Sequence, residues 1–149
     1  MNKLTLDYEK DFYAWLRHNV QLLRQGKLTD IDVDNIAEEL ESMGRSEKRE
    51  LVNRLAILLM HLLKWQYQPQ RRGKSWKNTI DTQREDILEL LQESPSLRHE
   101  LPAKLMSAYK KARRFAEDET GIDLNNFPST CPYTLEQILN EYFYPENDP

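Results

Sequence analysis

The stretch LVNRLAILLMHLLKWQYQPQRRGKSWKNTI, residues 51–80, decides the fold of this chain. Residues 55–63 form the longest apolar run in the sequence, and only His61 interrupts it. At 3.6 residues per turn, the apolar side chains cover most of a helix surface, which is typical of a helix buried among its neighbours. We therefore predict a buried central helix at about Ser46–Gln66. Its main apolar arc contains Leu51, Leu55, Leu58, Leu59, Leu62 and Trp65.

The remaining sequence also predicts helices. Apolar residues recur at helical spacing, and no segment alternates apolar and polar residues over the length of a strand. We predict an all-α, single-domain bundle of five to six helices that comprises residues 1–149, with a helical core at about 7–143 and a frayed acidic tail at 145–149. Besides the central helix, the expected helices are 7–25, 35–43, 76–93, 102–120 and a short one from 134 to about 142.

The connection before the central helix has two interpretations. Gly44 and Ser46 favour a break, with Ser46 as the N-cap of the central helix. The residues of helix 35–43 expected to face inward are Ile36, Ala37, Leu40 and Met43. Because this connection is so short, the two helices can equally be one kinked helix.

Other local patterns predict where helices begin and end. Ser75 is the expected N-cap of helix 76–93, and Gly121 the expected end of helix 102–120. Thr134 and Gln137 have the spacing of a capping box. Two pairs spaced by four residues are expected to support helix 102–120 through ion pairs. These pairs are Arg113 with Glu117 and Arg114 with Asp118.

Composition restricts the class of protein. A chain of 149 residues with a net charge of −4 has no overall basic field that would attract nucleic acid. Cys131 is the only cysteine, which excludes an internal disulfide and a multi-cysteine zinc site. Residues 1–12 carry charges where a signal peptide needs an apolar segment, and the run 55–63 is too short to cross a bilayer. We expect a cytoplasmic protein without a membrane segment.

The sharpest candidate site is a basic aromatic segment at Lys64–Lys77. Arg71, Arg72 and Lys74 lie between Trp65 and Trp76, with Tyr67 nearby, and residues 51–80 contain no Asp or Glu. Such a segment suits phosphate contact with base stacking, a nucleotide, or an acidic protein surface. The alternative is internal pairing with acids of residues 30–50 or of the last fourteen residues, within the chain or between subunits.

The sequence offers little support for catalysis or metal binding. His61 is a weak candidate for an acid or base, with Glu38 or Glu41 as partner if the helices that carry them are antiparallel neighbours. A buried histidine bonded to a carboxylate or the backbone is the favoured interpretation. No histidine has a glutamate three residues before it, as a di-iron bundle requires. We expect no metal and no cofactor, and an unreactive Cys131.

These motifs resemble a bacterial family that is abundant in cyanobacteria, domain of unknown function family 29. The resemblance extends from about Tyr8 to Pro145. It implies an almost entirely helical fold and implies no activity and no catalytic residue. The family motif includes His61, Lys64, Trp65, Pro69 and Trp76. The matching segments are YEKDFYAWL at Tyr8, EELESMGRSE at Glu38, LLMHLLKWQYQP at Leu58, SW at Ser75, SPSLR at Ser94, ETG at Glu119 and FPSTCPYT at Phe127.

The sequence favours a non-enzymatic protein-interaction or regulatory module, with a protein partner preferred over nucleic acid. The charges are segregated into acidic and basic blocks, which suits recognition. The alternative is a small nucleic-acid-acting protein, a nuclease or toxin–antitoxin component, that uses Lys64–Lys77 on phosphates and His61 as acid or base. A homo-oligomer is possible, with Ile57 and Met60 on a subunit interface.

Overall fold

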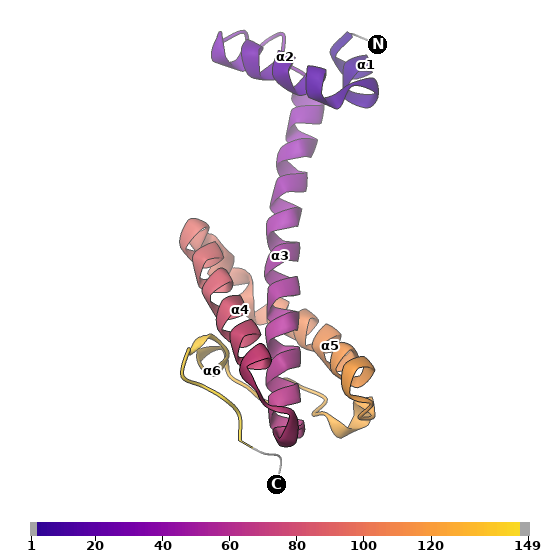
Figure 1. Ribbon diagram of the computed structural model, residues 1–149. Helices are drawn as coiled ribbons and strands as arrows, with labels where there is room; N and C mark the ends of the chain where they lie inside the picture. Colours follow the sequence, from indigo (N-terminus) through magenta and orange to yellow (C-terminus); the bar gives the residue numbers. More distant parts are fainter. Residues whose placement is uncertain (1–2, 147–149) are drawn as a thin grey trace. The chain divides into compact units, whose positions relative to one another are not determined.

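The computed structural model describes the backbone of residues 3–146 and the side chains of residues 7–146. The described chain forms six α-helices and three short 3-10 helices and contains no strand (Figure 1), so the predicted all-α class is confirmed. Two compact units are present, one within Met1–Ser46 and one within Glu47–Pro149. The single domain predicted for residues 1–149 stays a prediction.

The first unit begins with two helices where the sequence predicts one. Helix α1 spans Lys3–Lys10 and helix α2 spans Phe12–Arg24. Asp11 separates them, because its side chain accepts a 3.1 Å hydrogen bond from the Ala14 amide and so caps α2. Gly26 follows α2 with a φ of 73°, which glycine adopts without steric cost.

A buried polar network holds α2 to the loop that follows it. Trp15 Nε1 donates to the Asp32 carboxylate at 2.9 Å, and the Asp32 amide donates to the Asn19 side-chain oxygen at 2.9 Å. Asn19 Nδ2 in turn donates to the Trp15 carbonyl. Each buried polar group therefore has a partner, and Trp15, Asn19 and Asp32 are all buried.

Helix α3 is continuous from Val33 to Tyr67. The interpretation with a break at Gly44 is wrong, and Ser46 lies inside the helix and caps nothing. A single glycine costs a helix only about 1 kcal/mol relative to alanine, so good helix formers on both sides carry the helix through it. Leu40 and Met43, predicted to face inward, are 63% and 64% exposed.

The second half of α3 is the core of the second unit. Residues 51–64 include ten buried positions, and Figure 1 shows α4 and α5 on either side of this part of α3. The predicted central buried helix is therefore confirmed. Met60 is only 7% exposed and belongs to this core, so its predicted place on a subunit interface is wrong. Ile57 is half-buried.

The other elements of the second unit complete the core around α3. They are η1 (Pro69–Arg71), α4 (Lys74–Glu93), η2 (Pro95–Glu100), α5 (Leu101–Thr120), η3 (Leu124–Asn126) and α6 (Leu135–Leu139). The core residues that these elements add include Ile80, Ile87 and Leu91 from α4, Ala108, Ala112 and Ala116 from α5, and Phe127, Tyr133 and Ile138 from the C-terminal segment.

Several of the local predictions for this unit are confirmed and others are wrong. Gly121 ends α5 with a φ of 75°, and Thr134 and Gln137 form the predicted capping box of α6. Gly73, not Ser75, is the N-cap residue of α4. The expected tail begins at a buried Pro145, and residues 147–149 lie outside the described residues.

The predicted ion pairs on α5 are also wrong. Arg113 donates to the carbonyls of Leu124 and Phe127, and the Glu117 carboxylate accepts from the Leu124 amide. These side chains fasten the loop after α5, because main-chain groups of that loop lack helix partners. Among the described helices, none is long and apolar enough to cross a membrane.

Candidate functional site

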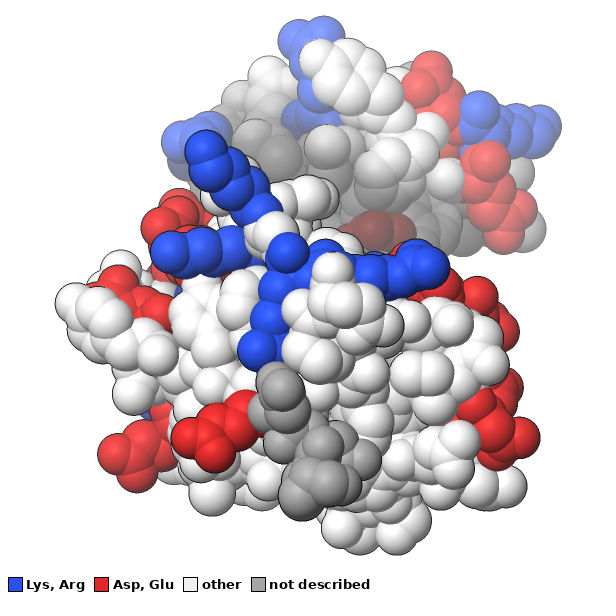
Figure 2. Space-filling model, turned by 60° about the horizontal axis from the view of Figure 1, so that its bottom comes forward, with Lys and Arg blue, Asp and Glu red and all other residues white. Residues whose placement is uncertain are grey.

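The basic aromatic segment Lys64–Lys77 lies where α3 ends, η1 follows and α4 begins. Figure 2 looks at this end of the second unit and shows Lys and Arg side chains gathered on it. The segment has five basic residues and no acid. The structure divides the five into two that are engaged inside the unit and three that are exposed.

Arg72 is engaged with the end of α3. Its Nε donates a 2.7 Å hydrogen bond to the Trp65 carbonyl, which lies in the last turn of the helix and has no helical partner to accept from. Its guanidinium carbon lies 5.1 Å from the centre of the Trp65 ring. The Tyr144 ring lies 4.8 Å from the same indole. Arg72 and Tyr144 therefore hold Trp65 in place.

Lys64 is engaged with two elements of the second unit. It is buried, and its ammonium pairs with the carboxylate of Glu119 near the end of α5. The same ammonium lies 4.8 Å from the centre of the Trp76 ring. The predicted alternative of internal pairing thus applies to Lys64, although its acid belongs neither to residues 30–50 nor to the last fourteen residues.

Arg71, Lys74 and Lys77 are exposed. Within the described part of the chain, none of these three side chains forms an ion pair or a hydrogen bond. We call these three residues the basic face. An exposed cation without a partner retains its full charge for a ligand, and three of them within seven residues form a local concentration of positive charge.

His61 is placed where acid–base chemistry is unfavourable. It is half-buried, and its Nδ1 lies 2.9 Å from the Ile57 carbonyl, an acceptor, so Nδ1 carries the proton. Burial is the main cause that lowers the pKa of His61, and the nearby Lys64 lowers it further. The neutral imidazole is therefore favoured at neutral pH.

The acids proposed as partners of His61 are engaged elsewhere. Glu38 and Glu41 precede His61 on the same helix α3, so the antiparallel pair of helices required for their contact is absent. Arg45 forms a 2.9 Å ion pair with Glu38 and lies 3.9 Å from Glu41. The Tyr8 hydroxyl donates to Glu39 at 2.6 Å, and this hydrogen bond raises the pKa of Tyr8 to about 12.

Metal binding has no candidate cluster in the part of the chain that the structure describes, since no three His, Cys, Asp or Glu side chains gather there. Cys131 is half-buried, and burial raises the pKa of its thiol. Its Sγ–H donates to the Tyr133 carbonyl at 3.4 Å. A raised pKa keeps the thiol protonated and disfavours nucleophilic chemistry.

Arg84 is a prominent buried residue that the sequence analysis missed. It is 1% exposed, and its guanidinium donates to the carbonyls of Ile138 at 2.8 Å, Phe143 at 2.7 Å and Gln137 at 3.4 Å. The Tyr144 ring lies 5.5 Å from the guanidinium carbon. One signal points to it in the sequence, because Ile80 and Ile87 are four residues before it and three after, on the same helix face.

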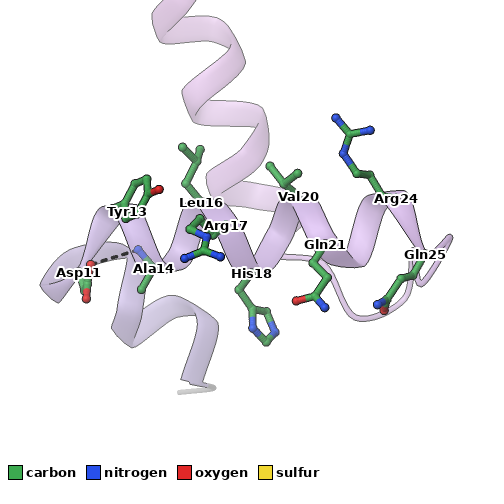
Figure 3. A pocket seen from close by; sticks show the side chains of 10 residues that line it. All are labelled: Asp11, Tyr13, Ala14, Leu16, Arg17, His18, Val20, Gln21, Arg24 and Gln25. Carbon is green, nitrogen blue, oxygen red and sulfur yellow. Dashed lines mark hydrogen bonds between the residues drawn. The ribbon is translucent and has the colours of Figure 1, made fainter.

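The first unit has a shallow hollow along α2 of about 810 Å³, open to solvent. Figure 3 shows its lining side chains, which belong to α2 and its two cap residues, Asp11 and Gln25. Leu16, Val20 and Arg24 point to one side of α2, whereas His18 and Gln21 point to the other. Because one helix and its caps provide the whole lining, the hollow is an open surface along α2 and is not enclosed by a second element.

The neighbouring arginines provide a matched pair for a stability experiment. We expect Arg72→Ala to lower the free energy of unfolding by about 1–2 kcal/mol, because it removes a hydrogen bond to a helix-terminal carbonyl and a cation–π contact. We expect Arg71→Ala to change it by less than about 0.5 kcal/mol, as for other exposed residues. Urea denaturation followed by circular dichroism measures both. Equal effects of the two substitutions would contradict the assignment of Arg72 as engaged.

Comparison with known protein families identifies a family for this chain. The model of the family described as Domain of unknown function DUF29 matches residues 7–144. This range includes both units in large part and the whole basic aromatic segment. No curated protein and no solved structure matches the chain.

Proposed function

We propose that this chain, which belongs to the DUF29 family, is a non-catalytic protein-interaction module that binds an acidic segment of a partner protein on its basic face. The basic face, Arg71, Lys74 and Lys77, is the observation that carries the proposal. Its three cations are exposed, and within the described residues they have no acidic partner. Acidic side chains of a partner would supply the missing counter-charges.

The position of these cations supports binding to a surface. They belong to η1 and the first turns of α4, beside a helix end fixed by Arg72 and Trp65. A fixed backbone reduces the conformational entropy that binding removes. Each single ion pair at such an exposed position contributes only up to about 1 kcal/mol, so affinity requires several pairs at once.

The aromatic contacts favour a protein partner over nucleic acid. Base stacking on a single strand needs accessible ring faces. The Trp65 ring already contacts Arg72 and Tyr144, and the Trp76 ring contacts Lys64. Both indoles are only partly exposed. The net charge of −4 also opposes the binding of a long polyanion, which would extend beyond the basic face. A short acidic segment would contact only the local positive charge of the basic face.

The position of His61 supports a non-catalytic role. A nuclease of the kind considered above needs an accessible acid or base. His61 lies on α3 among buried residues, its Nδ1–H is committed to the Ile57 carbonyl, and burial lowers its pKa. None of the hydrogen bonds of the described residues joins it to a carboxylate.

The experiment measures binding of a fluorescent glutamate-rich peptide by anisotropy. We expect the unmodified protein to bind it and the triple variant Arg71→Ala, Lys74→Ala, Lys77→Ala to lose at least about tenfold in affinity, since up to three pairs disappear. Binding should weaken as salt rises, because the screening length falls to about 10 Å at 0.1 M.

A matched control separates the basic face from total charge. Arg98, Lys110 and Arg114 are also exposed cations without ion pairs among the described residues, and their replacement by alanine removes the same charge. Equal losses in the two triple variants would contradict a localised site. A single-stranded oligonucleotide that binds the basic face more tightly than the peptide would support the nucleic-acid alternative instead.

A further inference from the structure

The first unit exposes an apolar stripe on α2. Tyr13, Leu16, Val20 and Leu23 are 67%, 40%, 41% and 43% exposed. Their spacing of three, four and three residues places them on one side of the helix, as in the seam of a coiled coil. Figure 3 shows Leu16 and Val20 pointing to the same side of α2.

A second stripe with the same spacing lies at the start of α3. It consists of Val33, Ile36, Leu40 and Met43, in which Ile36 is half-buried and the other three are 61%, 63% and 64% exposed. The first unit therefore carries two apolar stripes of equal length. Contiguous exposed apolar surface of this kind marks a site of association.

The charges beside the two stripes are of opposite sign. Exposed Arg17 and Arg24 accompany the stripe on α2, and Arg24 points to the side of Leu16 and Val20 in Figure 3. Exposed Asp34, Glu38 and Glu41 accompany the stripe on α3. Arg45 pairs with Glu38 and lies 3.9 Å from Glu41, so three acids against one base leave this surface with a net negative charge. The two helix surfaces thus match each other in both apolar spacing and charge.

Within one chain the two stripes do not cover each other. α2 is joined to the start of α3 through Trp15, Asn19 and Asp32, which lie on another side of α2. The first unit therefore supplies no cover for either stripe from its own elements. A second copy supplies both surfaces at once, since a two-fold arrangement uses each contact twice.

We infer that the first unit binds a second copy of this chain, with the stripe on α2 of each copy against the stripe on α3 of the other. The eight apolar side chains form the centre of the contact, and Arg17 and Arg24 face the acids of the partner. Pairing also gives the exposed start of α3 a neighbouring helix, which stabilises a helical segment more than propensity alone. This inference is independent of the basic face in the second unit.

Charge reversal gives a test that a general loss of stability cannot mimic. In Arg17→Glu, Arg24→Glu the α2 surface becomes acidic; in Glu38→Arg, Glu41→Arg the α3 surface becomes basic. Each variant alone brings like charges together in both contacts of a homodimer, which we expect to weaken association at least about tenfold. Mixed in equal amounts, the two variants place opposite charges in both contacts, so a heterodimer should form.

Sedimentation velocity across a concentration series measures these species, with differently labelled variants in the mixture. The expected result is a dimer of the unmodified protein, monomers of each variant alone and a heterodimer of the two. Leu40→Glu should abolish the dimer, whereas Met106→Glu, at a 77% exposed position of the second unit, should leave it intact. An unmodified protein that stays monomeric, or a mixture that does not associate, would overturn the inference.

Discussion

Arg84→Ala is expected to lower the free energy of unfolding of the second unit by about 3–5 kcal/mol, because it removes charge-assisted hydrogen bonds from a buried guanidinium and leaves the buried contact to the Ile138 carbonyl without a donor. The guanidinium is 1% exposed and donates to three main-chain oxygens of the C-terminal segment. Among the described residues, no carboxylate forms an ion pair with this guanidinium, and the nearby Asp81 accepts a hydrogen bond from the Tyr144 hydroxyl at 2.9 Å. Arg84 is therefore the main polar link between α4 and the segment that contains α6.

The measurement is urea denaturation, with hydrogen exchange of residues 135–143 to locate the effect. Arg84→Lys should recover only part of the loss, because an ammonium lacks the planar fork that reaches several acceptors. Glu85→Ala is the control, since Glu85 is the exposed neighbour on α4 and should change stability by less than about 0.5 kcal/mol. If Arg84→Ala also cost so little, the guanidinium would not be the link described here.

Leu59→Ala is expected to lower the free energy of unfolding by about 2–5 kcal/mol, because buried methyl groups are lost and a cavity is left behind. Leu59 has no exposed surface and lies in the middle of the buried part of α3. Alanine is a better helix former than leucine, so the loss would report packing and not helix propensity. The measurement is again the free energy of unfolding, determined by urea denaturation.

Ile57 provides the matched control for Leu59. It lies two residues earlier on the same helix but is half-buried. Ile57→Ala should therefore lower the free energy of unfolding by only about 1 kcal/mol, because less apolar area is removed from water at this position. A larger loss at Ile57 than at Leu59 would mean that the buried side of α3 differs from the one described.

The central helix could be predicted from the sequence because burial on nearly all sides leaves an apolar pattern that few other structures share. The same applies to short-range devices such as the capping box of Thr134 and Gln137, whose two hydrogen bonds depend only on neighbours in the chain. Because these interactions join residues that are close in the sequence, a short stretch of sequence is enough to predict them.

The continuity of α3 through Gly44 and the interruption before α2 were harder to predict. Gly44 and Asp11 are both residue types that often interrupt helices. Asp11 separates α1 from α2, whereas α3 continues through Gly44. Each choice depends on differences of about 1 kcal/mol, which flanking residues and distant contacts easily reverse. Leu40 and Met43 were expected to face inward because an apolar stripe predicts a partner surface without specifying which chain provides it.

The candidate site was predicted as a segment but not as a set of contacts. The cluster of bases in Lys64–Lys77 is visible in the sequence, whereas its division into Lys64 and Arg72 inside and the basic face outside depends on Glu119, Trp65 and Tyr144. Glu119 is 55 positions from Lys64 in the sequence, and Tyr144 is farther still from both bases. Such contacts arise only when the chain has folded.

Arg84 donates its hydrogen bonds to main-chain oxygens, and this affects which substitutions the C-terminal segment can accept during evolution. A carbonyl is the same group whatever side chain accompanies it, so substitutions at Gln137 or Phe143 leave the acceptors of Arg84 in place. No substitution in that segment, in turn, can replace a lost guanidinium. The contact should therefore produce no pair of co-varying positions among homologues, and Arg84 would appear as an isolated invariant residue even though it joins two parts of the chain.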